Sequence, residues 1–189
     1  MDIRPHIFAV RSYTPIPLII AVLILAEPNL YTVVSGGVIT CLGELLRLWA
    51  VGYAGSATRT RQVGAPALVT SGPFGLVRNP IYLGNLILSL GLCVMAWPWM
   101  PYMLGVFLAL FGIQYSLIVS LEEQQLKKIF KREYDDYCQV VPRFLPRLKP
   151  YKFRNKTHCN LQSALRSERR TFQSTIIVMI AIILRWQLF

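Results

Sequence analysis

Five apolar runs follow one another along the chain, separated by polar or turn-forming residues. The two strongest are Leu30–Tyr53, which is uncharged as far as Gly43, and Tyr102–Leu121, which has 20 uncharged residues. Between them, Ile81–Trp97 adds 17 residues without a charge. Because about 20 apolar residues cross a bilayer as a helix, these three runs predict membrane-spanning helices.

The first and last runs are shorter. Ser12–Ala26 has 15 uncharged residues, which is marginal for a span unless its flanks extend it. Phe172–Leu184 has 13, which suits either a short final span or a helix lying in the membrane interface. The whole pattern predicts an all-α, polytopic integral membrane protein with four or five transmembrane helices.

A different periodicity follows the fourth apolar run. From Glu122 to Tyr137, apolar side chains recur at helical spacing with charged residues between them, which predicts an amphipathic helix. Three prolines then interrupt the chain between residues 142 and 150. We therefore divide the chain into a membrane domain at residues 1–148, a basic cytoplasmic tail at 149–171 and a C-terminal apolar helix at 172–189.

Composition and charge narrow the class of protein. The chain is 54% apolar and only 15% charged, whereas a soluble domain averages about 25% charged. A net charge of +11 would suit nucleic acid, but 14 of the 20 Lys and Arg residues follow Leu121, outside the main apolar runs. This distribution fits the positive-inside bias of membrane proteins. We expect no nucleic-acid partner, and the scattered cysteines and histidines predict reduced thiols and no metal site.

The same charges predict an orientation in the membrane. The turn Trp97–Pro101 is uncharged, whereas the segments before Ile81 and after Leu121 are basic, which places both segments on the cytoplasmic side. The N-terminus is then cytoplasmic as well. The two helices of this hairpin are expected to approach through glycines, Gly84 and Gly91 on one helix and Gly105 and Gly112 on the other.

The hairpin would bring Arg78–Tyr82 beside Glu122–Glu123 at the cytoplasmic surface. An arginine can clamp a carboxylate bidentately, and a glutamate can accept from an ammonium or from ribose hydroxyls. Together these groups suit a zwitterionic nucleotide such as S-adenosylmethionine. The alternative is that they are interface anchors. Glu44 and Arg47, three residues apart in a span, are likewise either functional or a mutually neutralising pair.

Two ordered motifs carry a resemblance to a known family. The first is Gly72-Pro-Phe-x-x-Val-Arg-Asn-Pro-x-Tyr-x-Gly84, and the second is Glu122-Glu-x-x-Leu-x-x-x-Phe-x-x-x-Tyr-x-x-Tyr137, followed by Val141-Pro-Arg-x-x-Pro146. At this spacing they resemble the integral-membrane methyltransferases, a group that includes isoprenylcysteine carboxyl methyltransferase and the phospholipid methyltransferases. The resemblance covers a core at residues 45–147, so residues 1–148 would form a membrane methyltransferase domain.

The resemblance implies that S-adenosylmethionine binds at the cytoplasmic ends of the helices, with a tunnel opening to the lipid. From the chemistry of the side chains, we assign Arg78 to the cofactor carboxylate, and Glu123 to the cofactor or to the proton of an amine acceptor. The cofactor-binding positions that carry over are Pro66, Ala67, Leu68, Val69, Phe74, Asn79, Pro80, Ile81, Tyr82 and Glu122.

Three positions depart from the family pattern. Asn79 stands where the family usually has His, so it can donate and accept but cannot shuttle a proton. Lys131 replaces a common Gly, which we expect a helix to tolerate. Ile118 replaces an Arg that meets the substrate carboxylate in isoprenylcysteine methyltransferases. A neutral acceptor is therefore favoured, unless Arg47 supplies the missing charge from a neighbouring span.

We therefore expect an S-adenosylmethionine-dependent methyltransferase. Its acceptor would be lipophilic or membrane-embedded: a phospholipid amine, a thiol or an isoprenoid-type substrate, chosen near Ile118 and Arg47. One alternative is a membrane sterol-type reductase that uses NADPH, although such enzymes usually need more spans. The other is a non-enzymatic small membrane or lipid-binding protein. The sequence leaves the oligomeric state open.

Overall fold

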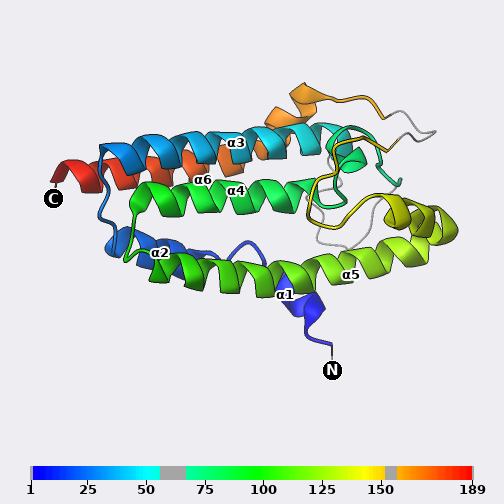
Figure 1. The fold of residues 1–189 in the computed structure, drawn as a ribbon, viewed down its shortest axis with the longest axis horizontal. Coiled ribbons are helices and arrows are strands. Elements are labelled where there is room, and N and C mark those ends of the chain that lie inside the picture. The colour runs from blue at the N-terminus through cyan, green and yellow to red at the C-terminus, as the bar shows by residue number, and fades with distance from the viewer. Residues whose placement is uncertain (1, 56–66, 152–156, 189) are drawn as a thin grey trace.

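The computed structural model describes residues 2–55, 67–151 and 157–188, and all regular secondary structure in these ranges is helical (Figure 1). The prediction of an all-α protein is confirmed. The elements are α1 (Arg4–Val10), α2 (Ile16–Ile24), α3 (Leu30–Ala54), a short 3-10 helix η2 (Gly72–Gly75), α4 (Pro80–Ala96), α5 (Tyr102–Val140) and α6 (Leu161–Leu188).

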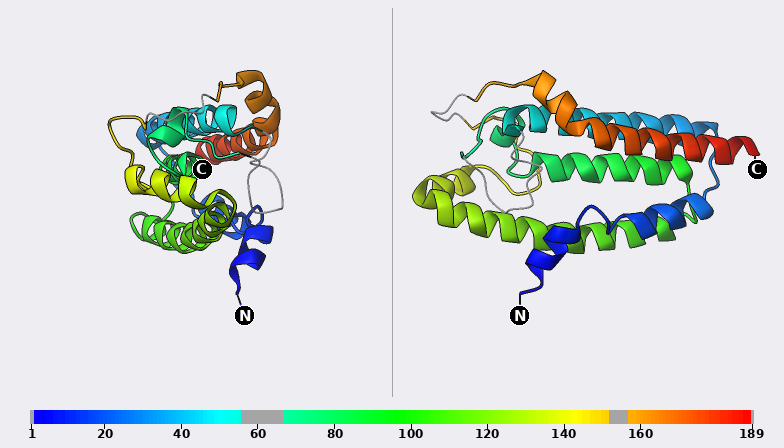
Figure 2. Two further views of the ribbon diagram at one scale, coloured as in Figure 1. Left: turned by 90° about the vertical axis from the view of Figure 1, so that its right-hand side faces the viewer. Right: turned by 180° about the vertical axis from the view of Figure 1, so that it is seen from behind.

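Three helices, α3, α5 and α6, are long and apolar enough to cross a membrane. The shorter apolar helix α4, of 17 residues, runs along the bundle with them (Figures 1 and 2). Together they give four helices of the expected kind. The first apolar run forms only the nine-residue α2, which is too short to span alone.

The last apolar run belongs to a longer helix than its composition indicates. Helix α6 has 28 residues and begins at Leu161, inside the range that we assigned to the basic tail. It lies beside α3 along the bundle (Figure 2), and it is long and apolar enough to cross a membrane.

Glycines determine which helices pack closely, and here the sequence-based expectation is wrong. Gly84 and Gly91 of α4 face α3: a Cβ atom on Gly91 would lie 2.4 Å from the backbone nitrogen of Thr40, and one on Gly43 of α3 would lie 2.3 Å from that of Leu88. By contrast, nothing lies within 4 Å of a Cβ atom placed on Gly105 or Gly112 of α5. Helix α4 therefore packs on α3 and stands apart from α5.

Helix α5 continues past the apolar run and kinks at Lys131, whose φ of 46° and ψ of −119° are not helical. This backbone conformation favours glycine, because a Cβ atom is crowded there. We expected a helix to accommodate Lys131, but the helix is not regular at this residue. The Gly that the resembled family commonly has at this position would adopt this conformation without strain.

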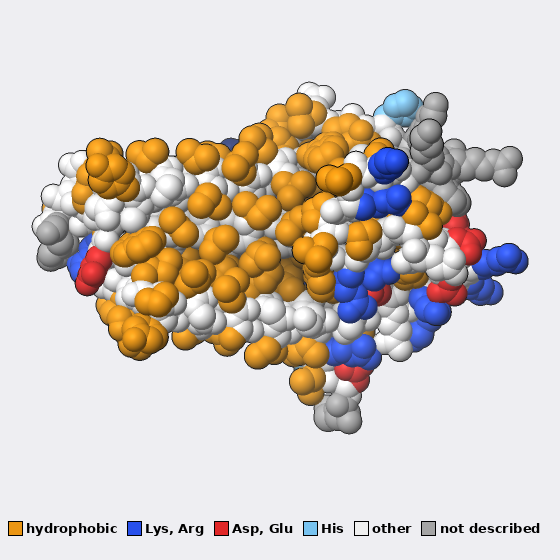
Figure 3. Space-filling view, in the orientation of Figure 1, with side chains coloured by type: hydrophobic (Ala, Val, Ile, Leu, Met, Phe, Trp, Pro, Cys, Tyr) orange, Lys and Arg blue, Asp and Glu red, His pale blue; other side chains and the backbone are white. Residues whose placement is uncertain are grey.

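Residues 67–79, which precede α4 and are called the motif loop below, are held in place by the end of α5 beyond the kink. Val141 and two tyrosines of α5 pack on Leu68, and the Tyr137 hydroxyl donates a 2.6 Å hydrogen bond to the Phe74 carbonyl. The Arg78 amide donates to the Pro142 carbonyl at 2.9 Å. On the face shown in Figure 3, apolar side chains cover the length of the helices, and most Lys and Arg side chains gather at this end.

Candidate functional site

A cavity of about 1370 Å³ opens where α4 and α5 stand apart. Helices α3, α4, α5 and α6 supply its walls together with residues 7–22, which we call the N-terminal segment, and the motif loop supplies its polar end. Eleven of the predicted site residues line it: Arg47, Ala67, Leu68, Val69, Phe74, Arg78, Asn79, Pro80, Ile81, Tyr82 and Glu122. The structure therefore brings most of the predicted site together.

Two described residues of the predicted site, Glu123 and Ile118, do not line the cavity. Glu123 lies behind the lining, in contact with Arg78 and Asn79. Ile118 is fully buried and is not part of the cavity wall. Pro66 lies outside the described residues.

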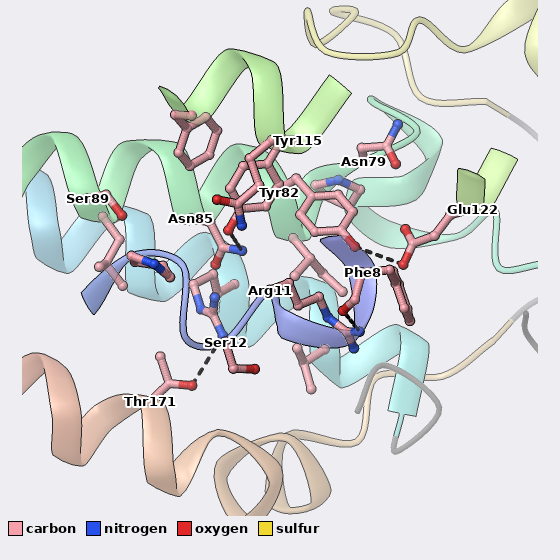
Figure 4. Close-up of a pocket in the computed structure, with 18 of the residues that line it drawn as sticks. Phe8, Arg11, Ser12, Asn79, Tyr82, Asn85, Ser89, Tyr115, Glu122 and Thr171 are labelled. Carbon is pink, nitrogen blue, oxygen red and sulfur yellow. Dashed lines mark hydrogen bonds between the residues drawn. The ribbon is translucent and has the colours of Figure 1, made fainter. Parts of the chain in front are cut away.

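A hydrogen bond between the side chains of Tyr82 and Glu122 joins the two motifs inside the cavity. The Tyr82 hydroxyl of α4 donates to a carboxylate oxygen of Glu122 on α5 at 2.8 Å (Figure 4). The Tyr82 ring also meets the Tyr115 ring edge-on, with 4.9 Å between centroids. These two contacts fix the direction of the Tyr82 side chain. The contact between the two ends of the hairpin is therefore present, although α4 and α5 do not pack through their glycines.

Glu123 joins three polar side chains. One carboxylate oxygen lies 3.2 Å from the Arg78 Nε atom and accepts from the Asn79 amide at 3.2 Å. The other accepts from the Arg143 Nε atom at 2.9 Å. The hydrogen bond to Glu123 also raises the pKa of the Arg143 guanidinium. With two guanidiniums and an amide around it, Glu123 holds the motif loop together through charge-assisted hydrogen bonds.

Arg47 has acidic neighbours on two helices. Its Nε atom lies 3.4 Å from Glu44, one turn earlier on α3, and its NH2 group pairs with Glu168 of α6. The side chains of Arg47 and Glu168 are 11% and 3% exposed, and Arg47 also reaches the Thr171 hydroxyl at 3.4 Å. The predicted Glu44–Arg47 pair is present, and Glu168 extends it to a third charged residue.

The sequence pattern did not identify the N-terminal segment as part of the site. Phe8 lies in α1, and Arg11 is the first residue after this helix. Both line the cavity and lie beside the Tyr82–Glu122 pair (Figure 4). The Arg11 guanidinium sits 3.8 Å above the Phe8 ring and donates to the Phe8 carbonyl at 2.9 Å. Helical spacing places these two residues on one face, but it does not indicate which distant element that face meets.

The sequence pattern also missed the contribution of α6. Glu168, Thr171 and Thr175 line the cavity and fall on one face of the helix. A single acidic residue among the basic residues of 149–170 was the available signal for Glu168. In the described part of the chain, no three His, Cys, Asp or Glu side chains are grouped as metal ligands.

Comparison with known protein families gives a match over the central part of the chain. Residues 31–133, more than half of the chain, match the family described as phospholipid methyltransferase. The matched region contains α3, α4 and α5 up to the kink, and therefore the Tyr82–Glu122 contact. The N-terminal segment and α6 lie outside it. No solved structure matches the chain significantly.

Three proteins that are similar in sequence to this chain have names that indicate different functions. The nickel-cobalt-cadmium resistance protein NccN of Alcaligenes xylosoxydans xylosoxydans is 33% identical over 56% of this chain and 46% of its own length. Protein-S-isoprenylcysteine O-methyltransferase B of Arabidopsis thaliana is 34% identical over 56% of this chain and 54% of its own. The Delta(14)-sterol reductase TM7SF2 of Mus musculus is 39% identical over 42% of this chain and 19% of its own. The chain thus spans about half the length, or less, of these relatives.

Proposed function

Since the chain belongs to the phospholipid methyltransferase family, we propose that it transfers a methyl group from S-adenosylmethionine to a lipophilic acceptor held in the membrane. The observation that carries this proposal is the Tyr82–Glu122 hydrogen bond inside the cavity. It joins the two motifs of the resemblance at one site. The cavity exceeds the roughly 300–1,000 Å³ of an ordinary small-molecule site, which leaves room for a cofactor and an acceptor together.

The residues present fit S-adenosylmethionine. Glu122 offers a carboxylate to an ammonium or to ribose hydroxyls, and Arg78 and Arg11 offer guanidiniums to a carboxylate. Leu68 and Phe74 offer an apolar surface to a purine ring. When bound, the cofactor supplies an electrophilic methyl group on its sulfonium. The protein's part in this proposal is to position the two reactants in line and to exclude water.

We propose that Glu122 and Glu123 have separate roles. Glu122 lines the cavity and would contact the cofactor directly. Glu123 would orient Arg78 and Asn79, because its carboxylate already serves both of them and Arg143.

The proposed acceptor is a neutral nucleophile such as an amine or a thiol. A substrate carboxylate would need a cation in the cavity wall near Ile118 or Arg47. Ile118 is apolar and buried, and Arg47 already has Glu44 and Glu168 as neighbours. Two carboxylates already surround the single guanidinium of Arg47, so a third carboxylate there would meet net repulsion. The name of the Arabidopsis relative concerns an isoprenylcysteine, and we do not extend that acceptor to this chain.

A second candidate function has one observation in its favour. Because the chain is similar to a sterol reductase, the second candidate is a membrane reductase that would bind NADPH in the same cavity. Its weakness is that the match covers only 19% of the reductase.

Calorimetric titration of the purified protein separates the two candidates. S-adenosylhomocysteine, the product form of the cofactor, should bind, and NADPH should not. Binding of NADPH alone would replace the methyltransferase proposal with the reductase, and no binding of either would favour a non-enzymatic protein. Membranes incubated with methyl-labelled S-adenosylmethionine should then carry label in extracted lipid. Label confined to prenylated protein would overturn the neutral-acceptor proposal.

A further inference from the structure

Beyond the Tyr82–Glu122 pair, the cavity continues along the apolar stretches of α4 and α5. Four polar side chains line it there, and the proposed cofactor site uses none of them: Asn85, Ser89, Gln114 and Tyr115. Gln114 comes eight residues before Glu122 on α5, which places it about 12 Å further along the helix. Polar side chains within a membrane span are uncommon and usually functional.

Tyr115 is held rigidly. Its ring stacks on Phe111 with 4.0 Å between centroids and meets the Tyr82 ring edge-on. Its hydroxyl oxygen accepts a 3.2 Å hydrogen bond from the Asn85 amide of α4 (Figure 4). The hydroxyl proton has no acceptor within the described residues, so it remains available to a ligand in the cavity.

Gln114 carries a second available donor. Its side-chain nitrogen is shielded from solvent and has no hydrogen-bond partner in the part of the chain that the structure describes. A buried donor without an acceptor destabilises a fold. Rotation about the last side-chain bond would turn this donor toward the cavity without moving the rest of the side chain.

We propose that Gln114 and Tyr115 form a subsite for a neutral carbonyl or ester oxygen on the acceptor. This inference rests on the proposed function and specifies its acceptor. Both donors are uncharged, so in an apolar setting they suit a neutral oxygen. The ester of a glycerolipid lies one headgroup length from the headgroup amine, a span similar to that from Gln114 to Glu122. A plain isoprenoid chain has no such oxygen and would leave both donors without an acceptor.

Two lipids that differ only at the ester test the subsite. The full chain would be given dioleoyl phosphatidylethanolamine and its di-O-alkyl analogue of equal chain length. Because one hydrogen bond of this kind corresponds to about a tenfold preference, methyl transfer to the diester should be about tenfold more efficient. Gln114→Met removes the donor at similar side-chain size and should abolish the preference by weakening the diester alone. Equal transfer to both lipids by the unaltered protein would overturn the subsite and leave the proposed function standing.

Lipid retention measured by native mass spectrometry, without any cofactor, makes the two proposals separable. The unaltered protein should retain the diester over the diether, and Gln114→Met should not. If retention behaves so but no methyl is transferred, the subsite stands and the proposed function fails. Equally strong retention of dioleoyl phosphatidylglycerol, which has the ester but no amine, would assign the subsite to a bilayer lipid and overturn its assignment to the acceptor.

Thermal unfolding provides the structural control. Removing a buried donor that has no acceptor should leave the Tm of Gln114→Met unchanged or higher. Ser116→Ala, on the exposed face of the same helix, should keep both the Tm and the ester preference. A lower Tm together with a lost preference in Gln114→Met would make the amide a structural group and overturn the subsite. Tyr115→Phe should repeat the loss of preference with the ring contacts kept.

Discussion

Adjacent carboxylates at the boundary of an apolar helix have different surroundings in this protein. Glu122 lines the cavity and accepts a hydrogen bond from Tyr82, whereas Glu123 turns to the loops and accepts from Asn79 and Arg143. Neighbouring residues on a helix point about 100° apart, so the backbone alone separates them. The sequence could show that a glutamate pair was present, but not this division of contacts.

Glu122→Gln should weaken binding of S-adenosylhomocysteine by roughly 10- to 100-fold, because hydrogen bonds to a charged group contribute about 1.5–3 kcal/mol. Calorimetry on the purified protein measures this loss. Asp136→Asn makes the same chemical change at an exposed position of α5 and should bind normally. Unaltered binding by the Glu122 variant would remove this carboxylate from the cofactor site.

Lys131→Gly should raise the free energy of unfolding by about 1 kcal/mol or more, since it relieves a side chain held at φ 46°. The matched change Lys128→Gly, at an exposed and regularly helical position three residues earlier, should lower it by about 1 kcal/mol. Chemical unfolding in detergent would compare the two. Destabilisation by both changes would mean that the kink does not strain Lys131.

Among the elements, α3 and α4 form a closely packed pair, and α5 is set apart from them. The apolar pattern predicted the extents of α3 and α4 to within one residue, because turns and prolines mark their ends. It did not predict their pairing. Four glycines were expected to join α4 to α5, yet Gly84 and Gly91 face α3. Glycine spacing shows that a helix can be approached closely, but not by which neighbour.

Gly91→Ala should destabilise the protein by about 1–3 kcal/mol, because the added methyl group would lie 2.4 Å from the Thr40 backbone nitrogen and force α3 and α4 apart. Gly112→Ala adds the same group to an open face of α5 and should be neutral or slightly stabilising. Thermal unfolding of both variants in one detergent makes the comparison. Equal effects would show that the α3–α4 contact tolerates widening.

At the scale of the whole molecule, the cavity combines residues from inside and outside the family match. The hairpin predicted the Tyr82–Glu122 contact because both ends of a single helical hairpin meet at one surface. Arg11 and Glu168 could not be predicted in the same way. Glu168 meets Arg47 across 121 residues of sequence, and no periodicity in the chain records which helix lies beside another. Residues inside the family match are therefore enclosed by segments that lie outside it.

The short helix α4 has a consequence for the surrounding lipid. Its 17 residues extend about 25 Å, whereas the hydrocarbon core of a bilayer is about 30 Å thick. Close packing on α3 prevents α4 from shifting independently to relieve this hydrophobic mismatch. If α4 spans the bilayer as predicted, we expect the bilayer to thin around it, at a modest cost for each ångström.

Methyl transfer should therefore be faster in bilayers of 14-carbon lipids than in bilayers of 22-carbon lipids, with S-adenosylhomocysteine affinity nearly unchanged. Nanodiscs of graded chain length measure both quantities, and equal rates in all of them would contradict the idea. Where thinning is easy, headgroups descend toward the level of Tyr82 and Glu122. The length of a single helix would then make membrane thickness a determinant of how readily a lipid meets the site.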